Sequence, residues 1–307
     1  MFLADAHCDT LTKALGAGEG LYDFGGHLNF RRLTGAFDGC LQFMAIYYKA
    51  RPGGMSGLAH DALDFFDNQA RKNGHTVRRI LCRDDLEADL RGRVGVLLSL
   101  EGGELLDGSL ENLRAFYERG VRSVCLTWSV RNELGDGTSV EEPHGLTDFG
   151  KEVVREMNTK RMIVDVSHAS PPTFWDAVEL SAAPVIASHS NAYGIYPHRR
   201  NLTDAQLRAI GGMKGFVGFN MYPEFIAGGE AGEDMMIRHI GRMLDMAGED
   251  CVGLGCDFDG IERTPDGYGS VSELPKLYRR VEKEFGTDVA AKVFWGNLVR
   301  VVKEILG

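Results

Sequence analysis

The residues of this chain that are able to bind a metal ion stand at the ends of apolar runs. The first run leads into Ala-His-Cys-Asp, where His7 and Asp9 are two residues apart and share one face of an extended segment. Glu101 closes the run VGVLLSLE, and His168 and His189 close two later runs. Three imidazoles and two carboxylates form a ligand set that suits zinc or a similar divalent ion.

Five ligands are more than one tetrahedral zinc with an open position needs. If Glu101 bridges, they divide into two sites, one with His7 and Asp9 and the other with His168 and His189. A lone histidine at a strand end is more often structural than a ligand. Agreement between four separate strand ends is different, and it favours a binuclear metal centre.

Two further motifs offer groups for proton transfer and for anion binding. The segment GLGCDFDG carries Asp257 and Asp259 on one face of its strand. Asp257 lies nearer the strand and is the candidate general base, whereas Asp259 precedes a glycine and suits a turn. Arg199 and Arg200 follow the SHS motif, where a guanidinium is able to grip a substrate carboxylate. A surface role for the two arginines is equally compatible with the sequence.

Short apolar runs alternate with helix-like stretches along the chain. The eight runs are FLADAHCD, CLQFMAIYY, VGVLLSLEG, VRSVCLTWS, MIVDVSHAS, PVIASHSN, GFVGFNMY and CVGLGCDFDG. The intervening periodicity predicts helices over Leu58–Lys72, Leu110–Arg119, Asp148–Lys160, Pro172–Leu180, Asp204–Ile210, Glu233–Ala247 and Glu273–Phe285. Three of these helices follow the capping residues Thr147, Ser170 and Thr203.

Continuous apolar strands such as VGVLLSL are typical of parallel sheets that are covered by helices on both faces. Eight β/α units predict a closed (β/α)8 TIM barrel of the α/β class. An open doubly wound sheet would gather its ligand groups near one switch point, whereas here they end four different strands. The glycine-rich regions 16–32 and 130–147 are expected to be loops over one barrel face, and residues 1–307 are expected to form one domain.

Composition excludes several classes of protein. With 44 acidic and 34 basic residues the formal charge is −10, which argues against nucleic acid and anionic membrane as partners. The 307 residues include 39 glycines, in line with many tight connections, and contain no apolar stretch of transmembrane length. The first residues do not form a signal peptide, and the six cysteines are scattered, so the sequence predicts a soluble, cytoplasmic protein with reduced thiols.

The blocks DAHCDT, LEGG, DVSHAS, SHSNAYG followed by HRRNLTD, and GLGCDFDGI stand in the order found in a known family. Together they resemble the membrane dipeptidase (renal dipeptidase) family of binuclear zinc peptidases, and WGNLVRVVKEI resembles that family's closing helix. The resemblance spans nearly the whole chain. It implies an amidohydrolase-like barrel that hydrolyses dipeptides, often with a D residue on the C-terminal side.

The same resemblance assigns the metal ligands. His7, Asp9 and Glu101 match the ligands of one zinc, while Glu101, His168 and His189 match those of the other. The implied cofactor is therefore two Zn²⁺ ions per chain with Glu101 bridging. The implied reaction is attack of a metal-bridging hydroxide on the scissile carbonyl of a dipeptide.

The resemblance also assigns groups that contact the substrate. Arg200 matches the residue that binds the free carboxylate of the dipeptide. Asp257 matches the acidic residue that takes the proton from the water and passes it to the leaving amine. Tyr222, in FNMYPEF, resembles a position beside the pocket.

One position departs from the family pattern. Renal dipeptidase has a histidine in the segment LTHS, but this chain reads LTWS and carries Trp128 there. The substrate-binding and oxyanion-supporting role of that histidine therefore does not carry over. Asn132, in SVRNELGDG, and the second zinc are the two candidates for taking over its hydrogen-bonding role.

Other functions fit the same ligand set. A metal barrel of this kind also serves as a lactonase, esterase, phosphotriesterase or deaminase, because fold and metal do not fix the substrate. From another class, a non-catalytic metal-binding barrel is the remaining alternative, and Trp128 is its only hint. A cationic clamp at Arg200 and a proton carrier at Asp257 favour a dipeptidase over both. A homodimer is expected only from the general habits of such barrels.

Overall fold

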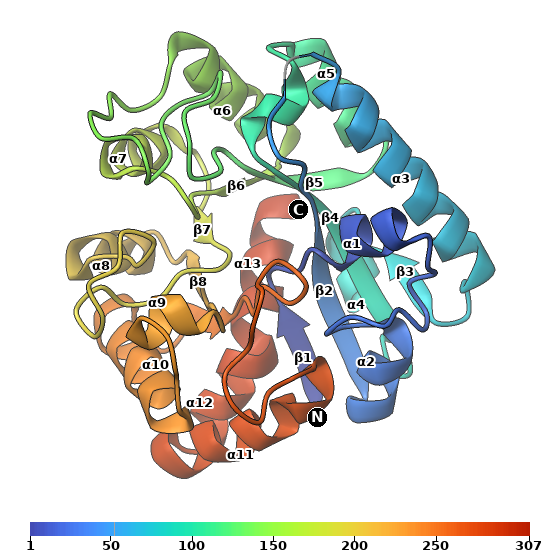
Figure 1. The fold of residues 1–307 in the computed structure, drawn as a ribbon, viewed down its shortest axis with the longest axis vertical. Coiled ribbons are helices and arrows are strands. Elements are labelled where there is room, and N and C mark those ends of the chain that lie inside the picture. The colour runs from blue at the N-terminus through green and yellow to red at the C-terminus, as the bar shows by residue number, and fades with distance from the viewer. Residues whose placement is uncertain (52) are drawn as a thin grey trace.

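Eight parallel strands close into a barrel in the computed structural model, which describes residues 1–51 and 53–307 (Figure 1). The ring closes because β1 pairs with both β2 and β9. Its strands are β1 (Phe2–Asp5), β2 (Gly39–Ile46), β4 (Val94–Glu101), β5 (Val121–Cys125), β6 (Ile163–Asp165), β7 (Ile186–Ala187), β8 (Phe216–Phe219) and β9 (Val252–Leu254). The predicted (β/α)8 TIM barrel is confirmed.

A ninth strand, β3 (Val77–Arg79), lies outside the ring and pairs only with β4. It was not predicted, because three residues are too few to show an apolar period. Within the ring β2 therefore pairs directly with β4, over the seven residues from Cys40 to Ile46.

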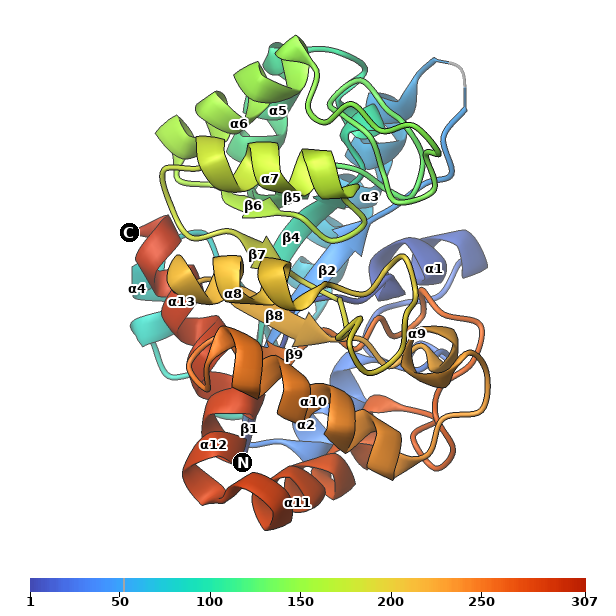
Figure 2. The ribbon, with the colours of Figure 1, turned by 90° about the vertical axis from the view of Figure 1, so that its left-hand side faces the viewer.

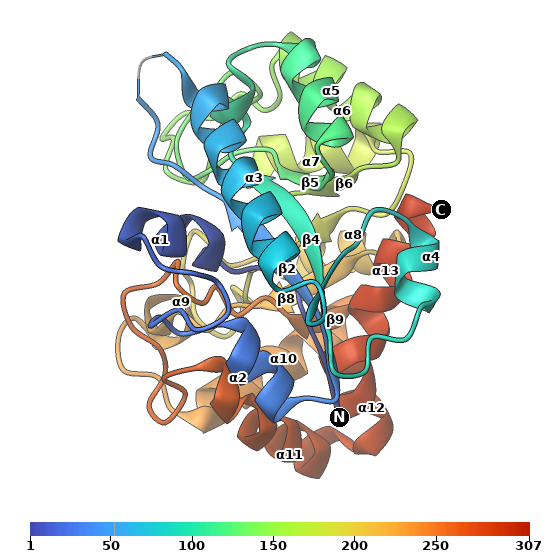
Figure 3. The ribbon, with the colours of Figure 1, turned by 90° about the vertical axis from the view of Figure 1, so that its right-hand side faces the viewer.

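Helices cover the outside of the barrel (Figures 1 and 3). They are α1 (Thr10–Ala17), α2 (Phe30–Ala36), α3 (Met55–Lys72), α4 (Arg83–Glu87), α5 (Leu110–Glu118), α6 (Asp148–Lys160), α7 (Pro171–Leu180), α8 (Asp204–Gly212), α9 (Pro223–Ala227), α10 (Glu233–Ala247), α11 (Leu274–Phe285), α12 (Thr287–Ala291) and α13 (Asn297–Leu306). Single turns of 3-10 helix (Gly103–Leu106 and Val271–Glu273) and of π-helix (Lys292–Gly296) complete the set.

All seven predicted helices are present, and α6 and α10 have the predicted bounds. The three predicted caps are confirmed, since the side chains of Thr147, Ser170 and Thr203 each accept a backbone hydrogen bond from the first turn. Region 130–147 is irregular as predicted, whereas the end of region 16–32 already forms the start of α2.

The two ends of the barrel are different. At one end α13 packs across the opening, where its Leu298, Val301 and Val302 join a buried cluster with Ala4 of β1 and Phe216 of β8. At the other end lie α1, α9 and the long loops, as Figures 2 and 3 show. Parallel strands carry their last residues to this second end, so polar side chains that close different strands meet there.

Two further properties concern the chain as a whole. All six cysteines are free, and five of them are buried. Among the described residues, no helix combines the length and the apolar composition that are needed to cross a bilayer.

Candidate active site and metal centre

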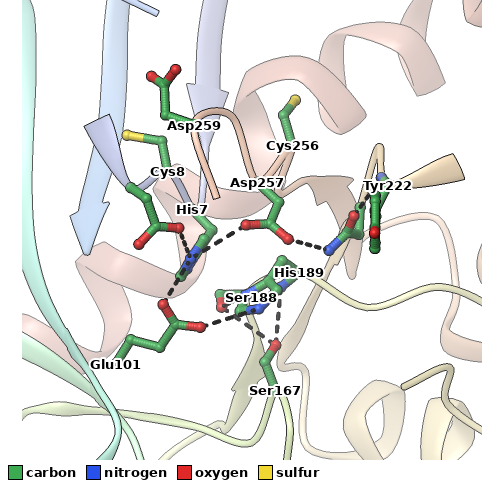
Figure 4. A network of polar contacts seen from close by, with 12 residues as sticks. His7, Cys8, Glu101, Ser167, Ser188, His189, Tyr222, Cys256, Asp257 and Asp259 are labelled. Carbon is green, nitrogen blue, oxygen red and sulfur yellow. Dashed lines mark hydrogen bonds and ion pairs between the residues drawn. The ribbon is translucent and has the colours of Figure 1, made fainter. Parts of the chain in front are cut away.

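The five predicted ligands come together at the C-terminal rim of the barrel, and Figure 4 shows three of them, His7, Glu101 and His189. His7 and Asp9 follow β1, Glu101 is the last residue of β4, and His168 and His189 follow β6 and β7. Each of the five is at most 7% exposed. Four strands that are distant in sequence thus deliver one buried polar cluster.

Glu101 divides its two carboxylate oxygens between different histidines. Its Oε2 lies 3.4 Å from Nε2 of His7, and its Oε1 lies 3.1 Å from Nε2 of His168 and 3.7 Å from Nε2 of His189. Asp9 lies on the first side, with Oδ2 3.5 Å from Nε2 of His7. This division is the geometry that a carboxylate bridging two ions requires.

The donor atoms of the cluster fit cations. Nε2 of His7 and Oδ1 of Asp9 are buried without a hydrogen-bond partner among the described residues, which is costly unless an ion or another ligand satisfies them. Two groups of three have ligand atoms within 4.8 Å of one another, His7 with Glu101 and His189, and His7 with Asp9 and Asp257. The second group adds Asp257 to the five residues that the sequence predicted.

Two serines orient the histidines. Oγ of Ser129 lies 2.9 Å from Nδ1 of His168, and Oγ of Ser188 lies 2.8 Å from Nδ1 of His189. The two Nε2 atoms face each other at 2.8 Å. If each Nδ1 donates its proton to the serine, both Nε2 lone pairs point into the same space, and a cation there removes their repulsion.

Burial and the concentration of carboxylates control the ionisation of this cluster. Burial opposes a charge on His7, but Glu101 and Asp9 outweigh it and raise the pKa of His7 well above the usual range. Burial, together with the positive charge of Arg200, lowers the pKa of His168 to about 3, and burial and nearby positive charge lower the pKa of His189 as well. His168 and His189 are therefore neutral near pH 7, as metal ligands must be.

Asp257 lies beside the cluster and is 8% exposed. Its Oδ1 is 3.8 Å from Nε2 of His7, and its Oδ2 accepts a hydrogen bond of 2.9 Å from Nδ2 of Asn220. Burial, reinforced by the charges of Asp9 and Glu101, raises the pKa of Asp257 to about 7. A carboxyl group that titrates near neutrality is suited to both accepting and releasing a proton.

The backbone around these groups is strained. His168 (φ +63°), Asp257 (φ +63°) and Asp259 (φ +67°) adopt the left-handed conformation, which non-glycine residues rarely enter. Asp259 accepts hydrogen bonds from Oγ1 of Thr10 and the backbone N–H of His27, so it holds two loops in place as a turn residue would. At Gly260 a Cβ would lie 2.2 Å from Oδ2 of Asp9, so only glycine fits there.

A cavity of about 400 Å³ opens over the cluster. Asp9, Glu101, His168 and Asp257 reach it from below, and it also has a wall of aromatic side chains. These include Tyr47, Tyr48, Trp128, Tyr222 and Phe225. The ring of Trp128 lies 5.4 Å from that of Tyr47 and 5.9 Å from that of His168, so Trp128 borders the space above the cluster.

Arg200 is buried behind this cavity. Its Nη2 donates a hydrogen bond of 3.0 Å to the backbone O of His189, and its guanidinium lies 5.3 Å from the ring of Phe225. Its Nε has no partner among the described residues. Arg200 lines a second cavity of about 280 Å³, which shares His168 with the first. A strongly buried guanidinium with an unused donor is suited to an anion, which is the role expected for Arg200.

Asn132 lies outside the main cavity. Its Nδ2 donates to Oε2 of Glu104 and to the backbone O of Leu126, and its Oδ1 accepts from the N–H groups of Leu134 and Gly135. These bonds use both ends of the amide to fold the loop after β5. A direct hydrogen bond from Asn132 to a substrate stays a prediction, and Asn132 is not among the residues that line the main cavity.

Sequence analysis missed the residues that support the ligands. Asp165, the last residue of β6, accepts hydrogen bonds from the N–H groups of Ser167 and Ser188 and so ties the two histidine loops together. Asn220 holds Asp257 from the end of β8. Ser188 could have been found from the sequence, because it is a polar residue directly before a candidate ligand in the SHS motif.

A (β/α)8 barrel with a buried set of histidines and carboxylates at its C-terminal rim is typical of metal-dependent hydrolases. Comparison with known families agrees with this class and identifies one family within it. The model of the membrane dipeptidase family (peptidase family M19) matches residues 1–306, and this chain belongs to that family. It is accordingly a metallo-dipeptidase, and the predicted family resemblance is confirmed.

Relatives in sequence and in structure agree with the assignment. The chain is 37% identical over 243 residues to an uncharacterized protein in the pqqA 5′ region of Klebsiella pneumoniae, covering 75% of this chain and 89% of that one. It is 36% identical over 220 residues to dipeptidase aclJ of Aspergillus oryzae, covering 70% of this chain but only 52% of that protein.

Two solved structures superpose on the whole chain with a TM-score of 0.89. One is dipeptidase AC, a metallopeptidase of family M19, at 28% identity with 100% of this chain and 99% of that chain covered. The other is a metallopeptidase from Rhodobacter sphaeroides bound to a phosphinate mimic of the dipeptide L-Ala-D-Ala, at 26% identity with 99% of each chain covered.

The contact between Ser188 and His189 makes a prediction about metal affinity. Replacing Ser188 by Ala removes the hydroxyl that orients Nδ1 of His189, and loss of such a partner weakens metal affinity about 10- to 100-fold. We expect that loss in a metal titration followed by calorimetry. Ser181→Ala, at the end of α7 and away from the cluster, serves as the control and keeps the wild-type affinity. Unchanged affinity in Ser188→Ala would show that His189 does not depend on this contact.

Proposed function

We propose that this metallo-dipeptidase uses two Zn²⁺ ions per chain and hydrolyses dipeptides that include L-Xaa-D-Xaa. The observation that carries the proposal is the division of the Glu101 carboxylate, with one oxygen toward His7 and the other toward His168 and His189. The phosphinate mimic of L-Ala-D-Ala bound by the Rhodobacter sphaeroides relative supports a D residue at the C-terminal position.

His7, Asp9 and Glu101 would hold one ion, and Glu101, His168 and His189 would hold the other. The orphaned Nε2 of His7 and Oδ1 of Asp9 fit this assignment. When bound, such ions supply Lewis-acid activation of water and of the scissile carbonyl. The serines and Asp165 keep the histidine rings in the required orientation.

Asp257 acts as the general base and then as the general acid in the proposed reaction. Its Oδ1 faces the ligand cluster, while Asn220 fixes Oδ2 and thereby the plane of the carboxylate. As water adds to the carbonyl, Asp257 accepts the water's proton. When the C–N bond breaks, it returns the proton to the departing amine, so it leaves the cycle unchanged.

Arg200 would hold the C-terminal carboxylate of the dipeptide from the second cavity, which shares His168 with the main cavity. Its Nε is the free donor for this contact, and the hydrogen bond of Nη2 to the backbone of His189 fixes the guanidinium next to the metal ligands. Tyr222 lines the main cavity together with Phe225, and its hydroxyl donates a hydrogen bond of 2.5 Å to Glu262. Trp128 lines the main cavity between the rings of Tyr47 and His168 and would border the bound substrate.

We also propose that residues 1–307 act as one catalytic domain, because α13 near the C-terminus packs on β1 at the N-terminus. The homodimer and the cytoplasmic location stay predictions.

The direct test of the function is turnover by the zinc-loaded protein. The panel consists of L-Ala-D-Ala, L-Ala-L-Ala, their C-terminal amides and a simple lactone. We expect hydrolysis of the free dipeptides, with L-Ala-D-Ala included, and a loss of about 10- to 100-fold in kcat/KM for the amides, because the charged hydrogen bonds to Arg200 are lost. Turnover of the lactone alone would contradict the proposal, and equal rates on acids and amides would remove Arg200 from its role.

Replacing Asp257 by Asn tests the proton carrier. The amide keeps the size and the contact with Asn220 but cannot accept the proton, so we expect kcat to fall about 100-fold or more. Metal content, measured on the same sample by mass spectrometry, is expected to stay at the wild-type level. Wild-type kcat would exclude Asp257 from proton transfer, and loss of metal would instead make Asp257 a ligand, as its grouping with His7 and Asp9 allows.

A further inference from the structure

The main cavity carries its lysines on one side only. Lys13 of α1 and Lys49 of the segment after β2 both line the cavity, together with Thr12, Tyr47 and Tyr48. Both lysines are exposed at its mouth. The opposite wall holds Tyr222, Phe225 and Glu262. The mouth thus carries two lysines on one side and the carboxylate of Glu262 on the other.

Figure 1 shows how the fold produces this polarity. α1, which carries Lys13, and α9, which carries Phe225, lie on opposite sides of the barrel opening. Figures 2 and 3 show both helices at the same end of the barrel, the end opposite α13. Arg200 lies behind the α9 side, within 5.3 Å of the Phe225 ring. The lysines and Arg200 are therefore separate cationic regions on opposite sides of the barrel opening.

Neither lysine is held in an ion pair by the residues that the structure describes, although the positive charge of Lys13 acts on the nearby carboxylate of Asp9. Within the described part of the chain, neither Lys13 nor Lys49 forms an ion pair with a carboxylate. The carboxylates of Asp9, Glu101 and Asp257 lie within 3.8 Å of Nε2 of His7. Lysine is a strongly hydrated point charge on a flexible stem, so each ammonium group can reach into the cavity toward a ligand. Two such groups at one place attract an anion through their summed field.

The orientation of the substrate identifies that anion. With its C-terminal carboxylate at Arg200 and its scissile carbonyl at the ligand cluster, a dipeptide directs its N-terminal residue away from α9. An extended dipeptide spans at most about 7 Å, so in this orientation its N-terminal residue would lie on the side of the cavity that α1 and residues 47–49 form. The hydroxyl groups of Tyr47 and Tyr48 add hydrogen-bond donors at this wall.

We propose that this chain prefers dipeptides whose N-terminal residue is Asp or Glu, with the side-chain carboxylate held by Lys13 and Lys49. The inference rests on the proposed dipeptidase function and names its substrate class. The lysines determine specificity and take no part in the bond cleavage itself. Their effect is confined to the part of the substrate that differs between an acidic and a neutral N-terminal residue.

The test compares L-Glu-D-Ala with L-Gln-D-Ala, which have the same shape and differ in the charge of one side chain. Exposed ion pairs contribute a few-fold each, so we expect the wild-type protein to favour L-Glu-D-Ala about 10-fold in kcat/KM at low salt. The preference is expected to shrink at high salt, because the charges are near solvent. In the double variant Lys13→Gln/Lys49→Gln the ratio is expected to fall to about 1, and in each single variant to about 3.

A matched control keeps the change in net charge and moves it elsewhere. Lys72→Gln/Lys283→Gln alters exposed lysines near the ends of α3 and α11, and neither residue lines the cavity. This variant is expected to retain the wild-type ratio. A second readout that needs no turnover is the inhibition constant of phosphinate mimics of the same two dipeptides, which is expected to show the same ratio.

The outcomes separate this inference from the proposed function. Hydrolysis of both dipeptides at equal rates by the wild-type protein would overturn the acidic preference and leave the dipeptidase standing. If the double variant keeps the preference for L-Glu-D-Ala over L-Gln-D-Ala, the lysines do not hold the acidic side chain. The same result is expected if the lysines hold the terminal carboxylate, which both substrates share. Failure of the zinc-loaded protein to cleave any dipeptide would overturn the proposed function, and the acidic preference with it.

Discussion

The buried carboxylate of Glu101 is the constraint on which the rest of the site depends. A carboxylate that is 3% exposed is stable only where positive charge or several donors surround it. Here the partners are the Nε2 atoms of His7, His168 and His189, which arrive from three other strands. Because His168 and His189 are held neutral, the positive charge next to Glu101 and Asp9 comes from His7, with more distant contributions from Arg200 and Lys13, and bound cations would add to it. Two divalent ions satisfy that requirement in the proposed enzyme.

Holding these groups together requires local distortion of the backbone. His168 and Asp257 adopt left-handed conformations at the points where β6 and β9 leave the barrel. Gly255 and Gly218 lie against the backbone O of Ser188, where a Cβ would come within 1.7 Å and 1.9 Å. The chain therefore passes very close to itself beneath His189. Such strain is tolerated because the eight paired strands and the packed core around them fix the geometry.

The sequence predicted the ligands because a parallel barrel brings the last residues of all its strands to one rim. His7, Glu101 and His189 each close an apolar run, and the parallel topology places the ends of these runs at the same rim. The fold followed from the same runs, which are continuous and apolar as buried parallel strands must be. Short elements such as β3 and α9 lack a period long enough to read.

Side-chain partners were beyond the sequence for a different reason. Whether Asn132 faces the substrate or folds its own loop depends on Glu104 and Leu134, whose positions only the tertiary structure defines. The orientation of Ser129 and Ser188 toward the histidines depends likewise on the packing of two separate loops. The opposition of Lys13 to the α9 side was also invisible, because those segments are more than 200 residues apart.

The proposed enzyme depends above all on Glu101 joining two metal sites. This role of Glu101 is tested most directly by counting the zinc ions retained per chain after extensive dialysis, with wild type and Glu101→Gln measured side by side by mass spectrometry. We expect two zinc ions per chain in the wild type and fewer than one in Glu101→Gln, since the amide cannot bridge. One zinc ion in the wild type, or two retained in both proteins, would contradict it.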